Sequence, residues 1–218
     1  MPGEKLIAAK ERWAREGRLL TGLVRSADKT SARDHDRLPP GQRLISDWPV
    51  LDLGAEPDVT AQKFRLDIVG AIENRIRLTL GAFMALPQLE TVSDIHCVTQ
   101  WSRYDNRWKG VAARTLLDLV RPMPEARYVM FHSFDGYTTN VAIEQFDQPD
   151  VLLVHEWEGK PLTGAHGGPV RMVIPRLYFW KSAKWLRRIE FGLSNRPGFW
   201  EQRGYHSNGD PWREQRYR

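Results

Sequence analysis

Cys97 is the only cysteine in this sequence of 218 residues. It lies in the run DIHCVTQWS (Asp94–Ser102), at the end of a predicted strand and before a polar loop. A thiolate in this position can bind a soft metal ion. Free cysteine is also among the most frequently buried residue types, so a thiol that only packs in the core is the alternative. A single cysteine excludes an intramolecular disulfide, a multi-cysteine zinc site and an iron–sulfur cluster.

A glycine-rich run, GAHGGPVR (Gly164–Arg171), is the second motif that could do chemistry. Glycines allow a backbone to approach a ligand closely. Arg171 lies two residues into the strand predicted next, where its guanidinium group could form paired hydrogen bonds with a phosphate. The alternative is a tight loop that precedes an edge strand.

The third motif is FWKSAKW (Phe179–Trp185), in which aromatic residues flank two lysines and a serine. These side chains suit a phosphate beside a flat heterocycle, because the lysines offer charge and the aromatic rings offer stacking surfaces. A charged loop held in place by aromatic anchors is the alternative.

Taken together with DGYTTN (Asp135–Asn140), the three motifs in this order resemble the sulfite oxidase family of molybdopterin enzymes. The similarity extends from about Trp48 to Phe191, and the tail over 204–212 resembles the short bacterial members of the family. The resemblance implies a sulfite oxidase-type molybdopterin-binding fold. It also implies a molybdenum–molybdopterin cofactor and oxidoreductase activity.

The resemblance assigns roles to individual residues. Cys97 matches the single protein thiolate that binds molybdenum, the remaining ligands being the dithiolene sulfurs of molybdopterin and oxo or hydroxo groups. Tyr137 falls where sulfite oxidases have an active-site tyrosine beside the metal. The residues expected to contact the cofactor are Trp48, Ser133, His166, Arg171, Ser182, Ala183 and Lys184.

One position departs from the family pattern. Sulfite oxidases have an Arg-Asn-His stretch before a Pro-Val pair, and here the corresponding run is ISDWPV, with Ile45 in place of the arginine. A dianion such as sulfite needs fixed positive charge at its site, so the substitution argues against sulfite as the substrate. Arg103, six residues after Cys97, is the candidate catalytic residue that could supply the charge, and Arg43 is the other candidate.

The elements that must position these residues are mostly short strands. Alternating apolar residues and short apolar runs predict strands over 64–68, 76–80, 128–131, 151–154, 170–174 and 185–193. Glycine favours a hairpin turn at Glu158-Gly159. Helical segments are few and are predicted over 82–86, 114–120 and 141–146. This pattern predicts an α+β fold of mixed β-sheets with short helices.

Three regions are expected along the chain. Residues 1–43 are predicted to form an N-terminal helix over 4–20 and an extended arm. Residues 44–195 form the molybdopterin-binding oxidoreductase domain that the resemblance implies. Residues 196–218 contain too many aromatic residues for a disordered tail, so this extension is expected to pack on the domain.

Charge and hydropathy narrow the classes of partner. The formal net charge is +5, and the excess of Lys and Arg lies in residues 1–37 and 196–218, so no basic stripe for nucleic acid is expected. The sequence contains no apolar run of about 18 residues, so no membrane-spanning helix is predicted. The N-terminus lacks the apolar segment of a secretory signal, and a lone thiol fits a reducing compartment. We therefore predict a cytoplasmic location.

The leading hypothesis is an enzyme that transfers an oxygen atom or an electron pair to or from a small sulfur-containing or S-oxide substrate. The cofactor would supply the difficult chemistry, and the protein would position and tune it. An electron-transfer partner, unidentified from the sequence, is needed to reset the metal. The alternatives are a non-catalytic molybdopterin carrier or storage protein, and a cofactor-free interaction domain on the same fold.

Overall fold

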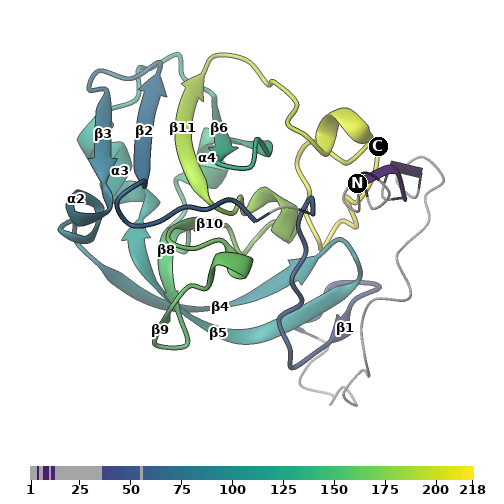
Figure 1. The fold of residues 1–218 in the computed structure, drawn as a ribbon. Coiled ribbons are helices and arrows are strands. Elements are labelled where there is room, and N and C mark those ends of the chain that lie inside the picture. Colours follow the sequence, from purple (N-terminus) through teal and green to yellow (C-terminus); the bar gives the residue numbers. More distant parts are fainter. Residues whose placement is uncertain (1–3, 5–6, 10, 13–35, 55) are drawn as a thin grey trace.

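Strands provide most of the secondary structure in the computed structural model, which describes residues 4, 7–9, 11–12, 36–54 and 56–218. Among these residues the strands form two mixed sheets, and the helices are short (Figure 1). The predicted α+β class with mixed sheets is therefore confirmed.

The first sheet has the strand order β1-β5-β8-β10, with β4 paired to β5 and β9 paired to β8. Its strands are β1 (Arg43–Leu44), β4 (Leu89–Cys97), β5 (Trp101–Ala112), β8 (Leu152–Trp157), β9 (Lys160–Pro161) and β10 (Arg171–Val173). β1 pairs with β5 in parallel, and the other pairs are antiparallel. In Figure 1, β4 and β5 run side by side along the base of the molecule, across the direction of β2 and β11.

The second sheet has the order β3-β2-β11-β6-β7. Its strands are β2 (Arg65–Gly70), β3 (Ile76–Thr79), β6 (Tyr128–Ser133), β7 (Thr138–Ala142) and β11 (Leu186–Gly192). β11 joins parallel to β2 and antiparallel to β6, so a late segment of the chain lies at the centre of this sheet.

Helices and 3-10 turns connect the strands. They are α2 (Leu80–Met84), α3 (Ala113–Val120), α4 (Ile143–Phe146), η2 (Gly164–His166), η3 (Phe179–Lys181) and η4 (Glu201–Arg203). The Thr79 hydroxyl begins α2 by accepting a hydrogen bond from the backbone N–H of Ala82 at 3.2 Å, as an N-cap residue does. None of the helices in the described part of the chain is both long and apolar enough to cross a membrane.

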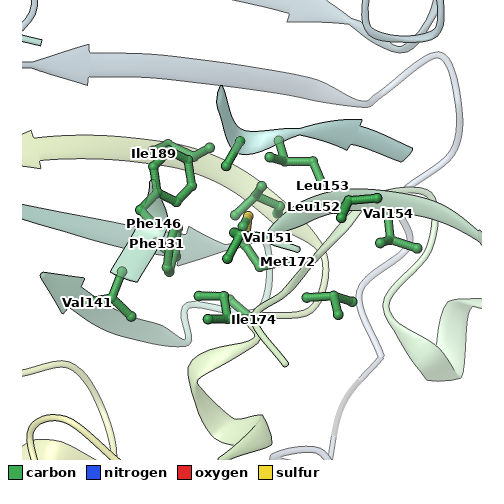
Figure 2. Packing of buried hydrophobic residues seen from close by; sticks show 14 of the residues in the cluster. Phe131, Val141, Phe146, Val151, Leu152, Leu153, Val154, Met172, Ile174 and Ile189 are labelled. Carbon is green, nitrogen blue, oxygen red and sulfur yellow. The ribbon is translucent and has the colours of Figure 1, made fainter. Parts of the chain in front are cut away.

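The hydrophobic core joins side chains from both sheets (Figure 2). Phe131 and Ile189 of the second sheet belong to the same buried cluster as Leu153 and Met172 of the first. α4 adds Phe146, which lies 5.8 Å from Phe131 between ring centroids. This core holds the two sheets together, so loops that leave either sheet keep fixed positions relative to each other.

Most predicted strands and helices lie within a few residues of their observed positions, and the main differences concern β7 and β5. The predicted helix 141–146 begins only at Ile143, because residues 138–142 pair with β6 as strand β7. β5 was not predicted from the sequence, although it has 12 residues and pairs with three other strands. The hairpin turn predicted at Glu158-Gly159 is confirmed between β8 and β9, with φ values of 52° and 72°.

The two end regions contact each other, and the C-terminal segment packs on the core. The described residues of the predicted helix 4–20 are helical, and the rest of that helix lies outside the described residues. Arg203 donates a hydrogen bond to Glu11 at 2.5 Å. Trp200 and Tyr205 of the C-terminal segment are buried, and Tyr205 pairs with Tyr217 in an isolated bridge. The boundaries of the three predicted regions stay a prediction.

Candidate active site

A cavity of about 120 Å³ lies where the turn after β4, the β6–β7 hairpin, the η2 and η3 loops and the C-terminal segment meet. Its lining includes residues 48–53, the β4–β5 turn over 97–101, and Trp200 and Tyr205 near the other end of the chain. The sequence-predicted residues that line it are Trp48, Cys97, Ser133, Tyr137, His166, Arg171, Ser182, Ala183 and Lys184. Three motifs that are far apart in the sequence therefore face one cavity.

Cys97 ends β4 at the cavity, as the sequence predicted for the end of a strand. Its side chain is 6% exposed, and its Sγ lies 3.1 Å from Oγ1 of Thr99. The backbone carbonyl of Cys97 accepts a hydrogen bond from Nε2 of Gln42 at 3.1 Å. The Thr99 contact orients the thiol, the Gln42 contact holds the backbone, and Cys97 lines the cavity, where a soft metal could bind its sulfur.

Tyr137 lies at the cavity because the β6–β7 hairpin turns sharply before it. Gly136 has a φ of 86°, a conformation that glycine adopts without strain, and the N–H of Tyr137 donates to Oδ1 of Asp135 at 3.0 Å. The phenol donates to the backbone carbonyl of Trp180 at 2.6 Å. Burial, and to a lesser extent the charge of Glu201, raise the pKa of Tyr137 well above its usual value, so the phenol is neutral.

His166 stacks on Trp48, with ring centroids 4.1 Å apart and an interplanar angle of 27°. Nε2 of His166 lies 3.1 Å from the carbonyl of Trp48, and Nδ1 lies 3.1 Å from the Thr163 hydroxyl. Burial lowers the pKa of His166, so the ring is neutral at pH 7. A carbonyl can only accept, which places the proton on Nε2.

The glycines of the η2 loop pack against the protein itself. A Cβ on Gly167, whose φ is 100°, would lie 2.9 Å from Cβ of Lys184, and one on Gly168 would lie 2.4 Å from the carbonyl oxygen of Leu162. The sequence suggested that these glycines bring the backbone close to a ligand. In the structure each glycine has a protein neighbour, because Gly167 lets the loop approach Lys184 and Gly168 lets it approach the backbone of Leu162.

Arg171 is a buried cation at the cavity, with 3% of its surface exposed. It donates to the backbone carbonyls of His166 at 2.7 Å and Ser182 at 2.8 Å, which links the η2 and η3 loops. Burial lowers its pKa to about 9. No carboxylate forms an ion pair with Arg171 in the part of the chain that the structure describes. A buried charge without a counter-ion is costly, so this position favours an anionic ligand.

Lys184 supplies a second cation. Its Nζ donates to the carbonyl of Ala165 at 2.9 Å and lies 3.9 Å from Oδ2 of Asp52. Burial, reinforced by the charge of Arg171, lowers the pKa of Lys184 to about 8, and Asp52 and Asp135 act in the opposite direction. The mostly protonated ammonium group at pH 7 suits a phosphate near it.

Two predicted sources of positive charge do not line the cavity. Arg103 donates from Nε to the carbonyl of Ser46 at 2.9 Å, contacts Asn106 and Glu158 through Nη1, and lies over the Trp157 ring. The structure does not bring Arg103 together with the other predicted residues, because these contacts hold it on the β5–β8 side. Arg43 and the buried Ile45 also lie outside the lining.

Lys181 of the third motif also points elsewhere. It is fully buried and forms an ion pair with Glu201 at 2.6 Å, so it is not available to a phosphate in the cavity. Of the two lysines in the motif, only Lys184 lines the cavity.

Sequence reasoning missed several lining residues, among them Asp52, Thr99, Asp135, Trp200 and Tyr205. Thr99 and Asp135 lie within motifs that were identified, so membership of those motifs was the available signal. Burial raises the pKa of Asp135, although the N–H of Tyr137 acts in the opposite direction. Trp200 and Tyr205 had only the aromatic content of their segment as a signal, because their position depends on how the tail folds back.

The cavity fits a group that combines a soft metal, a flat heterocycle and a phosphate. Cys97 offers the thiol, and Arg171 is a buried cation without a carboxylate partner among the residues described. The hydroxyl of Ser133 is buried at the cavity with no hydrogen-bond partner within the described part of the chain. A polar ring edge could satisfy it. The residues present therefore fit the cofactor that the resemblance implies.

Comparisons with known proteins agree with this geometry. Residues 53–200 match the family described as "Oxidoreductase molybdopterin binding domain". The chain is 43% identical over 199 residues to "Uncharacterized oxidoreductase YuiH" of Bacillus subtilis, a match that covers 90% of this chain and 97% of the relative.

Two longer relatives match over part of their length. The chain is 31% identical over 149 residues to "Putative protein-methionine-sulfoxide reductase subunit YedZ1" of Azospira oryzae, with 68% of this chain and 56% of the relative covered. It is 27% identical over 172 residues to "Protein-methionine-sulfoxide reductase catalytic subunit MsrP" of Campylobacter jejuni, with 69% and 58% covered. The chain thus spans just over half of these two relatives.

The fold is also similar to a solved structure, that of the sulfane dehydrogenase SoxCD from Paracoccus pantotrophus. The TM-score is 0.60 at 16% sequence identity, and the match covers 80% of this chain and 57% of that chain. At this identity the likeness supports the fold alone.

Proposed function

This chain belongs to the family of oxidoreductase molybdopterin-binding domains, and on that premise we propose that it reduces small, uncharged S-oxides. It is a molybdopterin-dependent oxidoreductase of the sulfite oxidase type, with a molybdenum–molybdopterin cofactor. The proposal concerns the substrate, the direction of the reaction and the roles of individual residues.

The charges around the cavity support an uncharged substrate. The lining contains two cations, Arg171 and Lys184, and two carboxylates, Asp52 and Asp135. A cofactor phosphate would bind the two cations, since Arg171 is buried, Lys184 is partly buried, and both suit an anion. The lining residues adjacent to Cys97 in sequence, Val98 and Thr99, are uncharged. No fixed positive charge in the lining is then left for a dianion such as sulfite.

The proposed residue roles follow from the contacts already described. Cys97 would be the protein ligand of molybdenum, and Arg171, Lys184, His166 and the Ser133 hydroxyl would hold the pterin and its phosphate. When bound, the cofactor supplies two-electron redox chemistry at the metal. The protein orients it, keeps the thiol at the cavity and surrounds the substrate with low-dielectric aromatic surface.

The proposed reaction is R₂S=O + 2e⁻ + 2H⁺ → R₂S + H₂O. The S–O bond breaks, sulfur is reduced, and the oxygen leaves as water. The electrons come from an unidentified electron-transfer protein, which we propose as the partner. Two relatives whose names specify protein-methionine-sulfoxide reductase are consistent with an S-oxide substrate. The cytoplasmic location inferred from the sequence stays a prediction.

A matched pair of substrates tests the charge argument directly. Methyl phenyl sulfoxide and its para-carboxylate analogue share the reacting group and differ by one negative charge. With a reduced viologen dye as electron donor, we expect kcat/KM to be at least about tenfold higher for the uncharged sulfoxide. Equal kcat/KM values for the two sulfoxides, or efficient sulfite oxidation, would contradict an uncharged substrate.

The carrier alternative predicts a different spectrum. In an enzyme, the visible band of the thiolate-bound metal should change when dye-reduced protein receives the sulfoxide. In a carrier, the band is present but the sulfoxide leaves it unchanged. The Cys97→Ser variant, which should lack the band, is the control for both.

A further inference from the structure

A fully buried ion pair lies next to the cavity without lining it. Nζ of Lys181 and Oε1 of Glu201 are 2.6 Å apart, and both side chains are 0% exposed. Lys181 belongs to η3, and Glu201 begins η4 in the C-terminal segment. The cost of removing both charges from water offsets much of the attraction in such a pair. Well-packed apolar residues in its place often stabilise a fold equally well or better. Stability alone therefore does not explain the pair, and its hydrogen bonds indicate what it does.

One oxygen of Glu201 is the point at which three donors converge. Oε1 accepts from the Thr139 hydroxyl at 2.7 Å and from the indole Nε1 of Trp180 at 3.1 Å, in addition to Lys181. Oε2 is buried and has no hydrogen-bond partner in the described part of the chain. The directional contacts of this carboxylate are thus concentrated on the side that faces β7 and η3.

Lys181 connects the same three segments from its own side. Its Nζ donates to the backbone carbonyls of Asn140 at 2.8 Å and Ser207 at 2.6 Å. Gly198 makes the approach possible, because a Cβ there would lie 2.5 Å from the carbonyl oxygen of Thr138. The pair therefore fastens the C-terminal segment to β7 and to η3 at one point.

Four aromatic residues that line the cavity are carried by these segments: Tyr137, Trp180, Trp200 and Tyr205, here called the aromatic wall. Tyr137 donates to the carbonyl of Trp180 at 2.6 Å, and Tyr205 lies 5.1 Å from Trp180 and 5.0 Å from Trp200 between ring centroids. Trp180 contacts Tyr137 and Tyr205, and its indole Nε1 donates a hydrogen bond to Glu201.

We propose that Glu201 is a positioning residue that, through the shared oxygen Oε1, holds the Trp180 indole and with it the aromatic wall around the cavity that Cys97 lines. It touches neither substrate nor cofactor, and it acts through Trp180. The charge of Glu201 also contributes to the raised pKa of Tyr137, which shows that the carboxylate lies within electrostatic reach of the wall. The catalytic consequence rests on the proposed function, whereas the positioning itself does not.

Two double variants isolate the shared oxygen. Lys181→Met with Glu201→Gln removes both charges but keeps a carbonyl oxygen for Thr139 and Trp180. Lys181→Met with Glu201→Met removes the same charges, has a side chain of similar length and offers no such oxygen. A purely structural ion pair would affect both variants equally, because both lose it.

The first readout is the rate at which iodoacetamide alkylates Cys97 in the full chain prepared without cofactor. Cys97 is the only cysteine, so mass spectrometry reports this position alone. We expect the double variant with Glu201→Gln to react within about twofold of wild type. The double variant with Glu201→Met should react at least about tenfold faster, because a displaced aromatic wall exposes the thiol. Equal rates in the two variants would overturn the proposal.

The second readout uses cofactor-loaded protein with matched molybdenum content. The double variant with Glu201→Met should lose at least about tenfold in kcat/KM for the sulfoxide, mainly through KM, while the double variant with Glu201→Gln stays near wild type. If wild type reduces no S-oxide at all, the proposed function fails, and the alkylation rates still decide on Glu201. If the double variant with Glu201→Met does not fold, Trp180→Phe is used instead, because it removes the indole donor to Glu201. A wild-type alkylation rate in Trp180→Phe overturns the proposal.

Discussion

The phenol of Tyr137 donates its hydrogen bond to the backbone carbonyl of Trp180, at an Oη–O distance of 2.6 Å. A phenol has one proton to donate, so Tyr137 can accept a hydrogen bond from a ligand but cannot donate one without breaking this contact. The family resemblance places this tyrosine beside the metal. The geometry assigns its proton to the backbone carbonyl of Trp180, so removing the hydroxyl should act first on that contact.

Tyr137→Phe should lower stability more than activity. The change leaves the buried carbonyl of Trp180 without a donor, which should cost about 1–3 kcal/mol of unfolding free energy in urea. The ring keeps its place, so kcat for the sulfoxide should fall less than about fivefold. Tyr128→Phe, at the start of β6 in the same hairpin, is the control. A hundredfold loss of kcat with unchanged stability would show that the phenol turns to the substrate.

Cys97→Ser should abolish turnover and the visible thiolate-to-metal band while the fold persists. Serine is nearly isosteric with cysteine, but a neutral hydroxyl is a poor ligand beside sulfur donors. Near-ultraviolet circular dichroism checks the fold, and steady-state assays with the dye check activity. Thr99→Val removes the neighbouring hydroxyl, 3.1 Å from Sγ, and serves as the comparison. Wild-type turnover in Cys97→Ser would refute the assignment of the metal ligand.

Arg171→Ala should weaken cofactor binding by about 1.5–3 kcal/mol, which is roughly 10- to 150-fold. The variant loses the buried charge and the bonds that join the η2 and η3 loops. Molybdenum per protein after purification measures the effect. Arg176→Ala is the matched control, because that exposed arginine pairs with Asp150 and does not line the cavity. Equal molybdenum content in the two variants would argue against a cofactor role for Arg171.

Cofactor affinity should fall as pH rises above about 8. In the protein without cofactor, burial lowers the pKa of Lys184 to about 8, so the lysine loses its proton in this range. A phosphate favours the protonated lysine, and binding must then take up a proton at a cost of up to about tenfold in affinity per pH unit. A phosphate monoester is already a dianion above about pH 7.5, so its own titration does not interfere.

Lys184→Met provides the reference for this pH dependence. Molybdenum retained after dialysis at pH 7.5, 8.3 and 9 should decline more steeply in wild type than in the variant, which binds weakly throughout. Parallel declines in the two proteins would show that another group titrates.

The sequence identified several residues that line the cavity through their local chemistry. Cys97, His166, Arg171 and Lys184 were found because each lies in a short motif whose residue types suit one ligand. Arg103 was chosen by its distance along the chain from Cys97, and that distance does not show that β5 carries it toward Asn106 and Glu158. Such positions depend on pairing between strands that are distant in sequence.

The same limit explains the elements that were missed. β5 contains the charged and polar run Arg103 to Arg107, which lacks the apolar alternation of a half-buried strand. It forms a strand because β1, β4 and β8 pair with it, and pairing of this kind outweighs local preference. Lys181 and Glu201 likewise meet only because the C-terminal segment folds back over η3.

The cavity is lined by residues from Trp48 to Tyr205, so almost the whole described domain must be folded before its walls are complete. In an unfolded or partly folded chain these residues are far apart, so the chain has no complete binding site for the cofactor. Cofactor binding energy is then available mainly to the native state, where it adds RT ln(1 + [L]/Kd) to the stability. A cofactor present at a thousand times its Kd would stabilise the fold by about 4 kcal/mol. Metal and pterin supply in the cell would therefore set the lifetime of this protein as well as its activity.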